Sequence, residues 1–373
     1  MLYIDVLLNS LSWRYPFRII SNVWYTFRSG PIAPKPFKLK IENTLFCNLK
    51  CNMCPHAGGM KRKKGNLTFE KFKYIFDQVE PCYLNLTGIG EPLMNPDIFK
   101  IISYGRKKRA FVKLDTNAML LNEENSGKML EANPSILSIS LDGMKKKTYE
   151  DIRTGANFEK VISNIRNFSQ MKQKLKSSME LHLFMVVQKK NLNEVMDFIK
   201  FGEEIKADSI NGTFVISLGL NENDKTAITN CKKEDLEKLR VQLKEARKRL
   251  GNRLKMDNMI KYLDEVCTKG RVETRGYNST KPCYLPWYAP YITWDGNVSP
   301  CDFYCENEIV FGNVFKEPFM KIWNNKKAQE FRKNLVKKRT GTCTICGVEE
   351  DFIYNSYWFL RKIPILNRFT YRK

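Results

Sequence analysis

Histidine is nearly absent from this chain of 373 residues, which contains only His56 and His182. Sites that need several imidazole ligands, such as a histidine-rich zinc or haem centre, are therefore excluded. No apolar run approaches the roughly 18 residues that a membrane-spanning helix requires. The N-terminus lacks the basic region and cleavage site of a secretory signal, and Asp5 interrupts its apolar run. We therefore expect a cytoplasmic protein.

Acidic residues are also in deficit. The chain has 40 Asp and Glu against 63 Lys and Arg, which gives a formal net charge of +23. Such a surface attracts anions, among them nucleic acid, acidic lipid headgroups, phosphorylated molecules and acidic peptides. A lysine-rich proteome would produce the same balance without any anionic partner, and composition alone does not separate the two readings.

Cysteine, in contrast, is abundant, with eleven residues. In a reducing cytoplasm, clustered cysteines bind metal or carry redox chemistry more often than they form disulfides. The stretch CNLKCNMC places Cys47, Cys51 and Cys54 within eight residues and offers no fourth thiol nearby. Structural zinc requires four protein ligands, whereas a [4Fe–4S] cluster with three thiolates leaves one iron open. The triplet therefore favours an iron–sulfur cluster with an open coordination position.

Short β-type runs alternate with amphipathic helical runs through the first two thirds of the chain. We expect strands at 37–43, 83–90, 111–117, 137–143, 180–187 and 209–218, and helices at 67–79, 96–108 and 158–175. This rhythm predicts an α/β fold with a parallel sheet and right-handed crossovers, in the form of a partial (β/α)6 TIM-like barrel. Chemistry in such barrels gathers at the carboxyl ends of the strands, and the cysteine triplet follows the first strand.

Changes in composition divide the chain into five segments. Residues 1–37 are aromatic and aliphatic, and they form either a helical cap on the main domain or an amphipathic membrane contact. The barrel is expected at 38–230 and a charged helical linker at 231–270. A small cysteine-rich extension occupies 271–350, and a basic aromatic tail occupies 351–373.

CNLKCNMC resembles the CxxxCxxC motif of radical S-adenosylmethionine (AdoMet, SAM) enzymes, with Met53 where an aromatic residue is usual. GIGEP, at the end of the second expected strand, resembles the glycine-rich GGEP motif of that family. The resemblance implies a [4Fe–4S] cluster whose open iron binds AdoMet, and reductive cleavage of AdoMet to a 5′-deoxyadenosyl radical. It also implies AdoMet-side residues, which are Gly88, Gly90, Glu91, Asn117, Ser140 and Arg153, with Asp142 facing the ribose. Each of these polar residues also fits a helix cap or a turn.

The order of the C-terminal cysteines resembles the opening of the SPASM and Twitch extensions of radical SAM enzymes. Twelve residues separate Cys283 from Gly296, and four separate Gly296 from Cys301. No cysteine follows Cys346, which favours the shorter Twitch form. The implied ligands of one auxiliary [4Fe–4S] cluster are Cys283, Cys301, Cys343 and Cys346. Cys305 either replaces one of them or stays spare. A zinc site built from Cys301, Cys305, Cys343 and Cys346 is the alternative.

We expect an oxidation or dehydrogenation assisted by the auxiliary cluster, because such a cluster can accept an electron from a substrate radical. Two alternatives are a peptide-modifying maturase and a noncatalytic iron–sulfur or zinc protein that binds nucleic acid. No leader-recognition domain is apparent, and nucleic acid is not favoured as a partner. The expected partners are an anionic or lipid-linked substrate and an electron donor such as ferredoxin or flavodoxin. Residues 1–30 and the C-terminal tail are expected to contact the inner membrane face peripherally.

Overall fold

The computed structural model describes residues 14–214, 231–269, 283–337 and 343. Their main feature is a ten-stranded sheet with the order β12-β11-β10-β1-β3-β4-β5-β7-β8-β9. Its central strands are β1 (Lys38–Ile41), β3 (Tyr83–Asn85), β4 (Phe111–Thr116), β5 (Ile136–Ser140), β7 (Glu180–Val187) and β8 (Ser209–Phe214). All neighbours among these six strands are parallel. The structure confirms the predicted partial α/β barrel.

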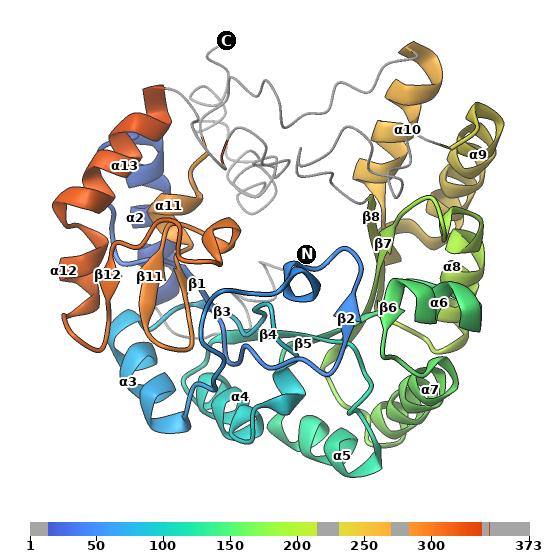
Figure 1. Cartoon of the computed structure of the whole chain (residues 1–373), viewed down its shortest axis with the longest axis horizontal. Helices are drawn as coiled ribbons and strands as arrows, with labels where there is room; N and C mark the ends of the chain where they lie inside the picture. The colour runs from blue at the N-terminus through green and yellow to red at the C-terminus, as the bar shows by residue number, and fades with distance from the viewer. Residues whose placement is uncertain (1–13, 215–230, 270–282, 338–342, 344–373) are drawn as a thin grey trace.

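Helices cover the convex face of this sheet, which curves into an open arc (Figure 1). They are α3 (Phe69–Val79), α4 (Ile98–Lys107), α5 (Glu123–Ala132), α6 (Lys146–Ile152), α7 (Phe158–Lys174) and α8 (Val195–Glu204). Side-chain caps begin several of them: Thr68 accepts a hydrogen bond from the Lys71 N–H, and Asn157 accepts one from the Lys160 N–H. Such caps satisfy donors that a helix start leaves without partners.

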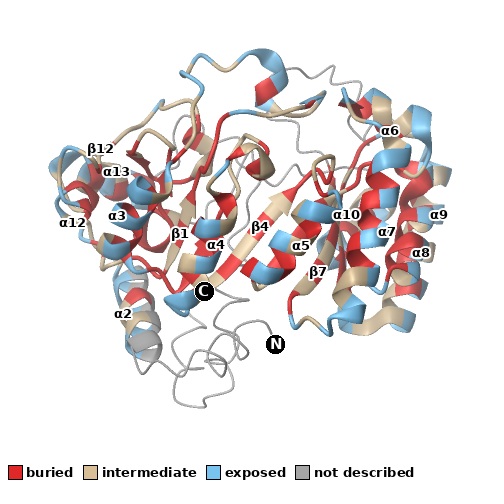
Figure 2. Cartoon of the chain, turned by 90° about the horizontal axis from the view of Figure 1, so that it is seen from below, coloured by how far each residue is buried: buried red, intermediate tan, exposed pale blue. Residues whose placement is uncertain are grey.

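Burial alternates along the barrel strands. In β4 and β7 every second residue is buried, and the residues between are only half-buried, as the alternating colours in Figure 2 show. The buried set, which includes Leu39, Val112 and Leu183, belongs to the apolar core shared with the helices. Successive side chains of a strand point to opposite faces, so the half-buried set lines the concave face. That inner wall carries charged residues such as Lys113, Asp115 and Glu180 beside apolar ones such as Phe184, unlike the branched aliphatic filling of a closed barrel.

The segment expected as a helical linker also contributes a strand. Helices α9 (Lys233–Leu250) and α10 (Asp257–Lys269) flank β9 (Leu254–Lys255), which pairs in parallel with β8. At the other edge, β10 (Tyr291–Ile292) pairs in parallel with β1, and the antiparallel strands β11 (Asn297–Ser299) and β12 (Gly312–Asn313) follow. The cysteine-rich extension is therefore continuous with the barrel sheet.

The remaining helices pack beside this edge. They are α2 (Arg14–Arg28), α11 (Leu285–Tyr288), α12 (Phe319–Trp323) and α13 (Lys326–Lys337). Arg332 is fully buried among them, and its guanidinium donates hydrogen bonds to the carbonyls of Pro286, Pro31 and Trp323. One side chain thus joins α13 to the N-terminal linker and to α11. No helix in the described part of the chain is both long and apolar enough to cross a bilayer.

Candidate active site

The three cysteines lie on the loop that leaves the carboxyl end of β1, as the sequence predicts. A short ladder fixes this loop, because β2 (Lys50–Cys51) pairs with β6 (Arg153–Thr154) and places Cys51 opposite Arg153. The Cys54 N–H donates to the Cys51 carbonyl at 3.0 Å. Each thiol is half-buried, and its pKa responds to at least one other member of the triplet or to Arg153. The loop therefore presents three neighbouring thiols as one group.

Burial opposes the ionisation of these three thiols. Burial raises the pKa of Cys47 to about 11 and also raises the pKa of Cys51 and of Cys54. Within the described residues, no three Cys, His, Asp or Glu side chains converge as ligands of one metal ion. Thiolates of a cluster bind different irons and so stand further apart than ligands of a single ion. The donor set fits an iron–sulfur cluster, whose assembly would deprotonate the thiols.

Arg153 lies beside Cys51 of the triplet. Its guanidinium pairs with the fully buried carboxylate of Asp142, at 2.8 Å from Nε and 2.7 Å from Nη2. Its Nη1 is 3.8 Å from the Cys51 sulfur. Asp142 also accepts a hydrogen bond from the Val186 N–H at 2.7 Å. The expected ribose-side and carboxylate-side residues thus form a buried ion pair that links the cysteine loop to β5 and β7.

Glu91 and Asn117 join the tip of β4 to the cysteine loop. The Glu91 carboxylate is buried and accepts hydrogen bonds from the Thr116 hydroxyl (2.6 Å) and from the backbone N–H groups of Asn117 (2.8 Å) and Leu93 (3.2 Å). Burial raises the pKa of Glu91, and these hydrogen bonds oppose the rise. The Asn117 side chain donates to Asn48, which lies between the first two cysteines, at 2.9 Å. Glu91 and Asn117 therefore stabilise the shape of the site through these hydrogen bonds.

Gly88 and Gly90 allow two loops to touch. A Cβ on Gly90 would lie 2.6 Å from the Phe46 carbonyl oxygen, and a Cβ on Gly88 would lie 2.7 Å from the Glu42 side chain. The Glu91 N–H donates to the same Phe46 carbonyl at 2.8 Å. A side chain at either glycine would therefore push the glycine-rich loop off the cysteine loop. Their expected contact with AdoMet stays a prediction.

Two hydroxyl groups beside the triplet have no hydrogen-bond partner within the described chain. Ser140 ends β5 at the carboxyl edge of the sheet, and no described group hydrogen-bonds its hydroxyl. The Tyr149 hydroxyl is buried and has no hydrogen-bond partner among the described residues. Arg153, Asp142 and Cys51 lie near enough to Tyr149 to affect its pKa, which burial raises. Buried polar groups are normally hydrogen-bonded, so these atoms fit a site that receives a polar ligand.

The C-terminal cysteines separate into two environments. Burial and the neighbouring Asp302, Cys283 and Cys343 raise the pKa of Cys301, so Cys283, Cys301 and Cys343 lie near one another. The Tyr304 hydroxyl is 3.1 Å from the Cys343 sulfur. Cys346, the fourth predicted ligand, lies outside the described residues. The role of the three described cysteines as ligands of the auxiliary cluster stays a prediction.

Cys305 faces other charges. Burial raises its pKa to about 11, and the groups that affect it are Glu308, Arg62, Glu306 and Glu42. Arg62, from the segment after the triplet, pairs with the buried Glu42 at 2.7 Å. Tyr291 on β10 donates to the same carboxylate at 2.8 Å. This network joins the cysteine loop to the auxiliary region. From the sequence alone, only Glu42 could have indicated this network, because it is an acidic residue directly after a buried strand.

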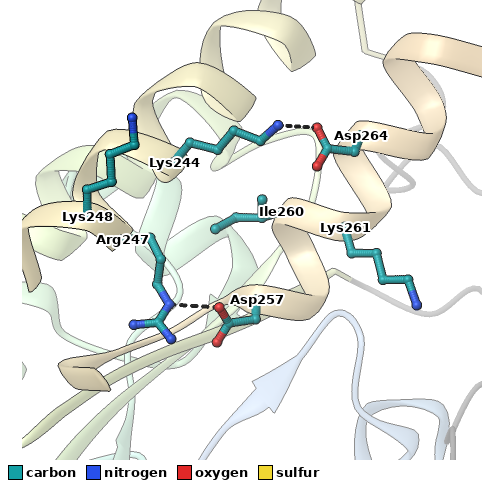
Figure 3. A pocket seen from close by; sticks show the side chains of 7 residues that line it. All are labelled: Lys244, Arg247, Lys248, Asp257, Ile260, Lys261 and Asp264. Atoms are coloured by element: carbon teal, nitrogen blue, oxygen red, sulfur yellow. Dashed lines mark hydrogen bonds and ion pairs between the residues drawn. The ribbon is translucent and has the colours of Figure 1, made fainter. Parts of the chain in front are cut away.

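One hollow of about 360 Å³ lies away from both cysteine groups, between α9 and α10 (Figure 3). Basic side chains line it, but two of them are paired: Arg247 with Asp257 at 2.7 Å and Lys244 with Asp264 at 2.5 Å. No cysteine or carboxyl-edge loop residue contributes to its lining. We therefore place the chemistry at the cysteine loop and not in this hollow.

Two family models match the chain. The model described as the radical SAM superfamily matches residues 41–202, and the SPASM model, an iron–sulfur cluster-binding domain, matches residues 283–347. The AdoMet-dependent heme synthase of Methanosarcina barkeri is 29% identical over 319 residues, which cover 82% of this chain and 86% of that protein. The mycofactocin maturase MftC of Mycobacterium ulcerans is 25% identical over 316 residues, or 84% of this chain and 80% of that protein.

Solved structures show the same fold. The AdoMet-bound structure of anSMEcpe aligns with a TM-score of 0.59 at 23% identity, over 89% of this chain and 96% of that chain. Streptococcus suis SuiB bound to S-adenosylmethionine aligns with a TM-score of 0.62 at 16% identity, over 86% of this chain and 74% of that chain. At these identities the likeness supports the barrel and its extension alone.

Proposed function

Because this chain belongs to the radical SAM superfamily and carries a SPASM domain, we propose that it cleaves AdoMet at a cluster held by Cys47, Cys51 and Cys54. When bound, the cluster and AdoMet supply an electron and a 5′-deoxyadenosyl radical that abstracts hydrogen from a substrate. The observation that carries the proposal is that three neighbouring thiols lie on one loop at the carboxyl edge of the sheet. The β2–β6 ladder stabilises this loop. Arg153, Glu91 and Asn117 hold that loop in place.

We assign the AdoMet side of the site to Gly88, Gly90, Glu91, Asn117, Ser140 and Arg153. Among them, Ser140 has a hydroxyl that no described group engages, which supports direct contact with a ligand. Glu91, Asn117 and Arg153 are engaged within the chain and would act by setting the shape and charge of the site. The positive charge of Arg153 beside Cys51 favours a thiolate there, because it opposes the effect of burial.

The proposed reaction is an oxidation in which the auxiliary cluster accepts the second electron from the substrate. Its ligands would be Cys283, Cys301, Cys343 and Cys346. The grouping of the first three around Cys301 supports this set, and the separate surroundings of Cys305 support leaving it out. Ferredoxin or flavodoxin is the proposed donor of the first electron.

The relatives point to two kinds of substrate. The M. barkeri relative is a heme synthase, and MftC is a maturase. SuiB, which shares the fold, has been solved with its precursor peptide SuiA. A peptide maturase is therefore the second candidate function, while an oxidised non-peptide substrate is the first.

We also propose a peripheral membrane contact through α2. Phe17, Ile20 and Trp24 are more than half exposed on this helix, and the Arg28 guanidinium lies 4.4 Å from the Trp24 ring. Helix α2 has no acidic residue. Exposed aromatic and aliphatic side chains with arginine suit the surface of an anionic bilayer.

Co-sedimentation with anionic and with neutral vesicles tests the proposed membrane contact of α2. Binding should fall in an Ile20→Ser/Trp24→Ser variant and persist in Tyr74→Ser, another exposed aromatic. Equal, negligible sedimentation with both vesicles would contradict the contact.

The experiment for the main proposal is anaerobic reconstitution with iron and sulfide, followed by reduction in the presence of AdoMet. We expect 5′-deoxyadenosine to be released. Iron and sulfide contents above those of one [4Fe–4S] cluster would support the auxiliary site. Metal binding without AdoMet cleavage would instead support the noncatalytic reading.

A further inference from the structure

We propose that the exposed side of the cysteine loop is the docking surface for a small acidic protein that carries one electron. Its basic residues are Lys50, Lys61, Lys63 and Lys64. The inference rests on the proposed function, because it concerns the delivery of the electron that AdoMet cleavage consumes. It goes further by assigning the surface and the chemical class of the partner. The carrier loses one electron, the cluster gains it, and no atom is transferred.

The chain around the triplet is positively charged over a long stretch. No Asp or Glu occurs between Glu42 and Glu70, whereas this stretch contains Lys50 and the run KRKK at 61–64. All four lysines are exposed, and no carboxylate in the described part of the chain pairs with any of them. A surface with charge of one sign attracts a partner of the opposite sign and speeds its association.

The KRKK run is held firmly in place. Its arginine, Arg62, turns inward, where its side chain is 6% exposed and pairs with the buried Glu42 at 2.7 Å. The Trp294 indole donates a hydrogen bond to the Lys63 carbonyl at 3.1 Å, and its ring leaves no room for a side chain at Gly65. Because Arg62 is used inside the protein, the lysines beside it are left to the solvent. Charges on a segment that is already ordered bind a partner at a low cost in entropy.

The turn after Cys54 leaves the triplet open to a partner. This turn, η1 (Pro55–Gly58), has only small side chains besides the buried His56, and its other residues are exposed. A Cβ at Gly58 or Gly59 would have no other atom within 4 Å. A partner protein can therefore approach Cys54 without meeting a large side chain of this turn.

Lysines from both sides of the triplet in the sequence meet beside this turn. Burial lowers the pKa of His56, and the charges of Lys64 and Lys50 lower it further. Both ammonium groups must lie near the imidazole to act on it, because exposed charges are screened within about 10 Å. The positive charge and the open turn therefore belong to one surface next to Cys54.

This combination favours an electron carrier over other acidic partners. Electrons pass between proteins only where the two redox centres come close together, and the open turn lies next to a proposed cluster ligand. Complexes of electron-transfer proteins are small and weak, so a turn and four lysines are sufficient. The net charge of +23 indicates an anionic partner but gives no location for it.

Anaerobic titration calorimetry of the reconstituted holoprotein tests this surface. An acidic flavodoxin and an acidic ferredoxin are titrated in separate runs into the wild type and into the test variant Lys61→Gln/Lys63→Gln/Lys64→Gln. We expect at least one carrier to bind the wild type, with an affinity that falls as salt is added. Its affinity for the test variant should be about tenfold lower, because each exposed ion pair contributes a few-fold.

The matched control is Lys107→Gln/Lys174→Gln/Lys176→Gln. It removes the same charge from exposed lysines where α4 and α7 end, and no carboxylate in the described ranges pairs with them. Its affinity for the carrier should stay at the wild-type value. Equal affinities in the wild type and the test variant would overturn the inference, as would equal losses in the test and control variants or a wild type that binds neither carrier.

The release of 5′-deoxyadenosine separates this inference from the proposed function. Dithionite is small and needs no docking surface, so the test variant and the wild type should release 5′-deoxyadenosine equally with it. With the reduced carrier at low concentration, the test variant should be slower. A wild type that releases none with dithionite would overturn the proposed function, while the calorimetry still reports on docking. Loss of binding to anionic vesicles in the test variant, with its affinity for the carriers intact, would assign the lysines to a membrane and overturn the inference.

Discussion

The Lys40 ammonium lies 2.5 Å from the Asp302 carboxylate. Lys40 belongs to the strand that leads into the cysteine triplet, and Asp302 follows Cys301 directly in the sequence. One ion pair therefore connects the strand before the cysteine triplet to the segment that contains Cys301, a proposed ligand of the auxiliary cluster. Together with the β1–β10 ladder, it fixes the auxiliary region against the barrel.

Replacing Asp302 with Asn should weaken this connection. The pair is partly exposed, so we expect the free energy of unfolding to fall by about 1 kcal/mol. The double variant Lys40→Met/Asp302→Asn should lose less than the sum of the single losses, because the two side chains interact. Denaturant unfolding of the four proteins measures this coupling. Strictly additive losses would mean that the pair does not hold the two regions together.

Replacing Arg153 with Met should be far more damaging. It would leave the Asp142 carboxylate, which is fully buried, without its charged partner, at a cost of roughly 3–5 kcal/mol. Arg153→Met/Asp142→Leu should recover part of that loss, since it removes the stranded charge. The matched control is Arg166→Met, which breaks the exposed pair with Glu204 and should cost less than about 1 kcal/mol. Similar losses for Arg153→Met and Arg166→Met would show that Asp142 does not depend on Arg153.

Tyr149→Phe should not destabilise the protein before the cluster is inserted. Its hydroxyl is buried without a partner, and removing such a group should leave stability unchanged or raise it by about 1 kcal/mol. Tyr291→Phe is the control, because that hydroxyl donates to the buried Glu42 and its loss should cost roughly 1.5–3 kcal/mol. Thermal unfolding of both apoproteins distinguishes the cases. A clear loss of stability in Tyr149→Phe would show that the Tyr149 hydroxyl has a hydrogen-bond partner in the folded apoprotein.

Lys38→Met should stabilise the protein at neutral pH. The pKa of Lys38 is lowered from 10.5 to about 8, so below pH 8 both states carry the charge and the folded state bears the full cost of burying it. Between pH 8 and 10.5 the unfolded chain binds the extra proton, and the stability of the wild-type protein rises with pH relative to the variant. The stabilisation should therefore shrink across that window. Unfolding curves of the wild type, of Lys38→Met and of the control Lys100→Met at several pH values measure this effect. If the difference in stability between the wild type and Lys38→Met does not change with pH, the pKa of Lys38 is not lowered.

Much of the barrel was predictable from the sequence because strand residues alternate with such regularity. Leu39, Val112 and Leu183 face the helices, while Lys40 and Lys113 occupy the intervening positions. The predicted second strand was too long, since the chain leaves the sheet after Asn85 and turns into the glycine-rich loop. Propensity marks the start of such a strand better than its end, which depends on the loop packed against it.

Within the candidate site, only the residues that belong to sequence motifs were predictable. Spacing identified Cys47, Cys51 and Cys54, but it could not show that Arg153 would pair with Asp142. That pairing depends on the ladder between Cys51 and Arg153, which are far apart in the sequence. In the same way, the joining of β10 to β1 placed Asp302 beside Lys40. Both contacts follow from tertiary register, which local sequence does not encode.

The most direct measurement of the central claim is AdoMet cleavage by variants of each cysteine group. Anaerobically reconstituted wild-type protein, Cys51→Ala and Cys301→Ala are reduced with AdoMet, and 5′-deoxyadenosine and iron are quantified in each sample. We predict that Cys51→Ala releases no 5′-deoxyadenosine, whereas Cys301→Ala still releases it while containing less iron than the wild type. Cleavage that survives in Cys51→Ala, or that wild-type protein never shows, would contradict the assignment of the triplet.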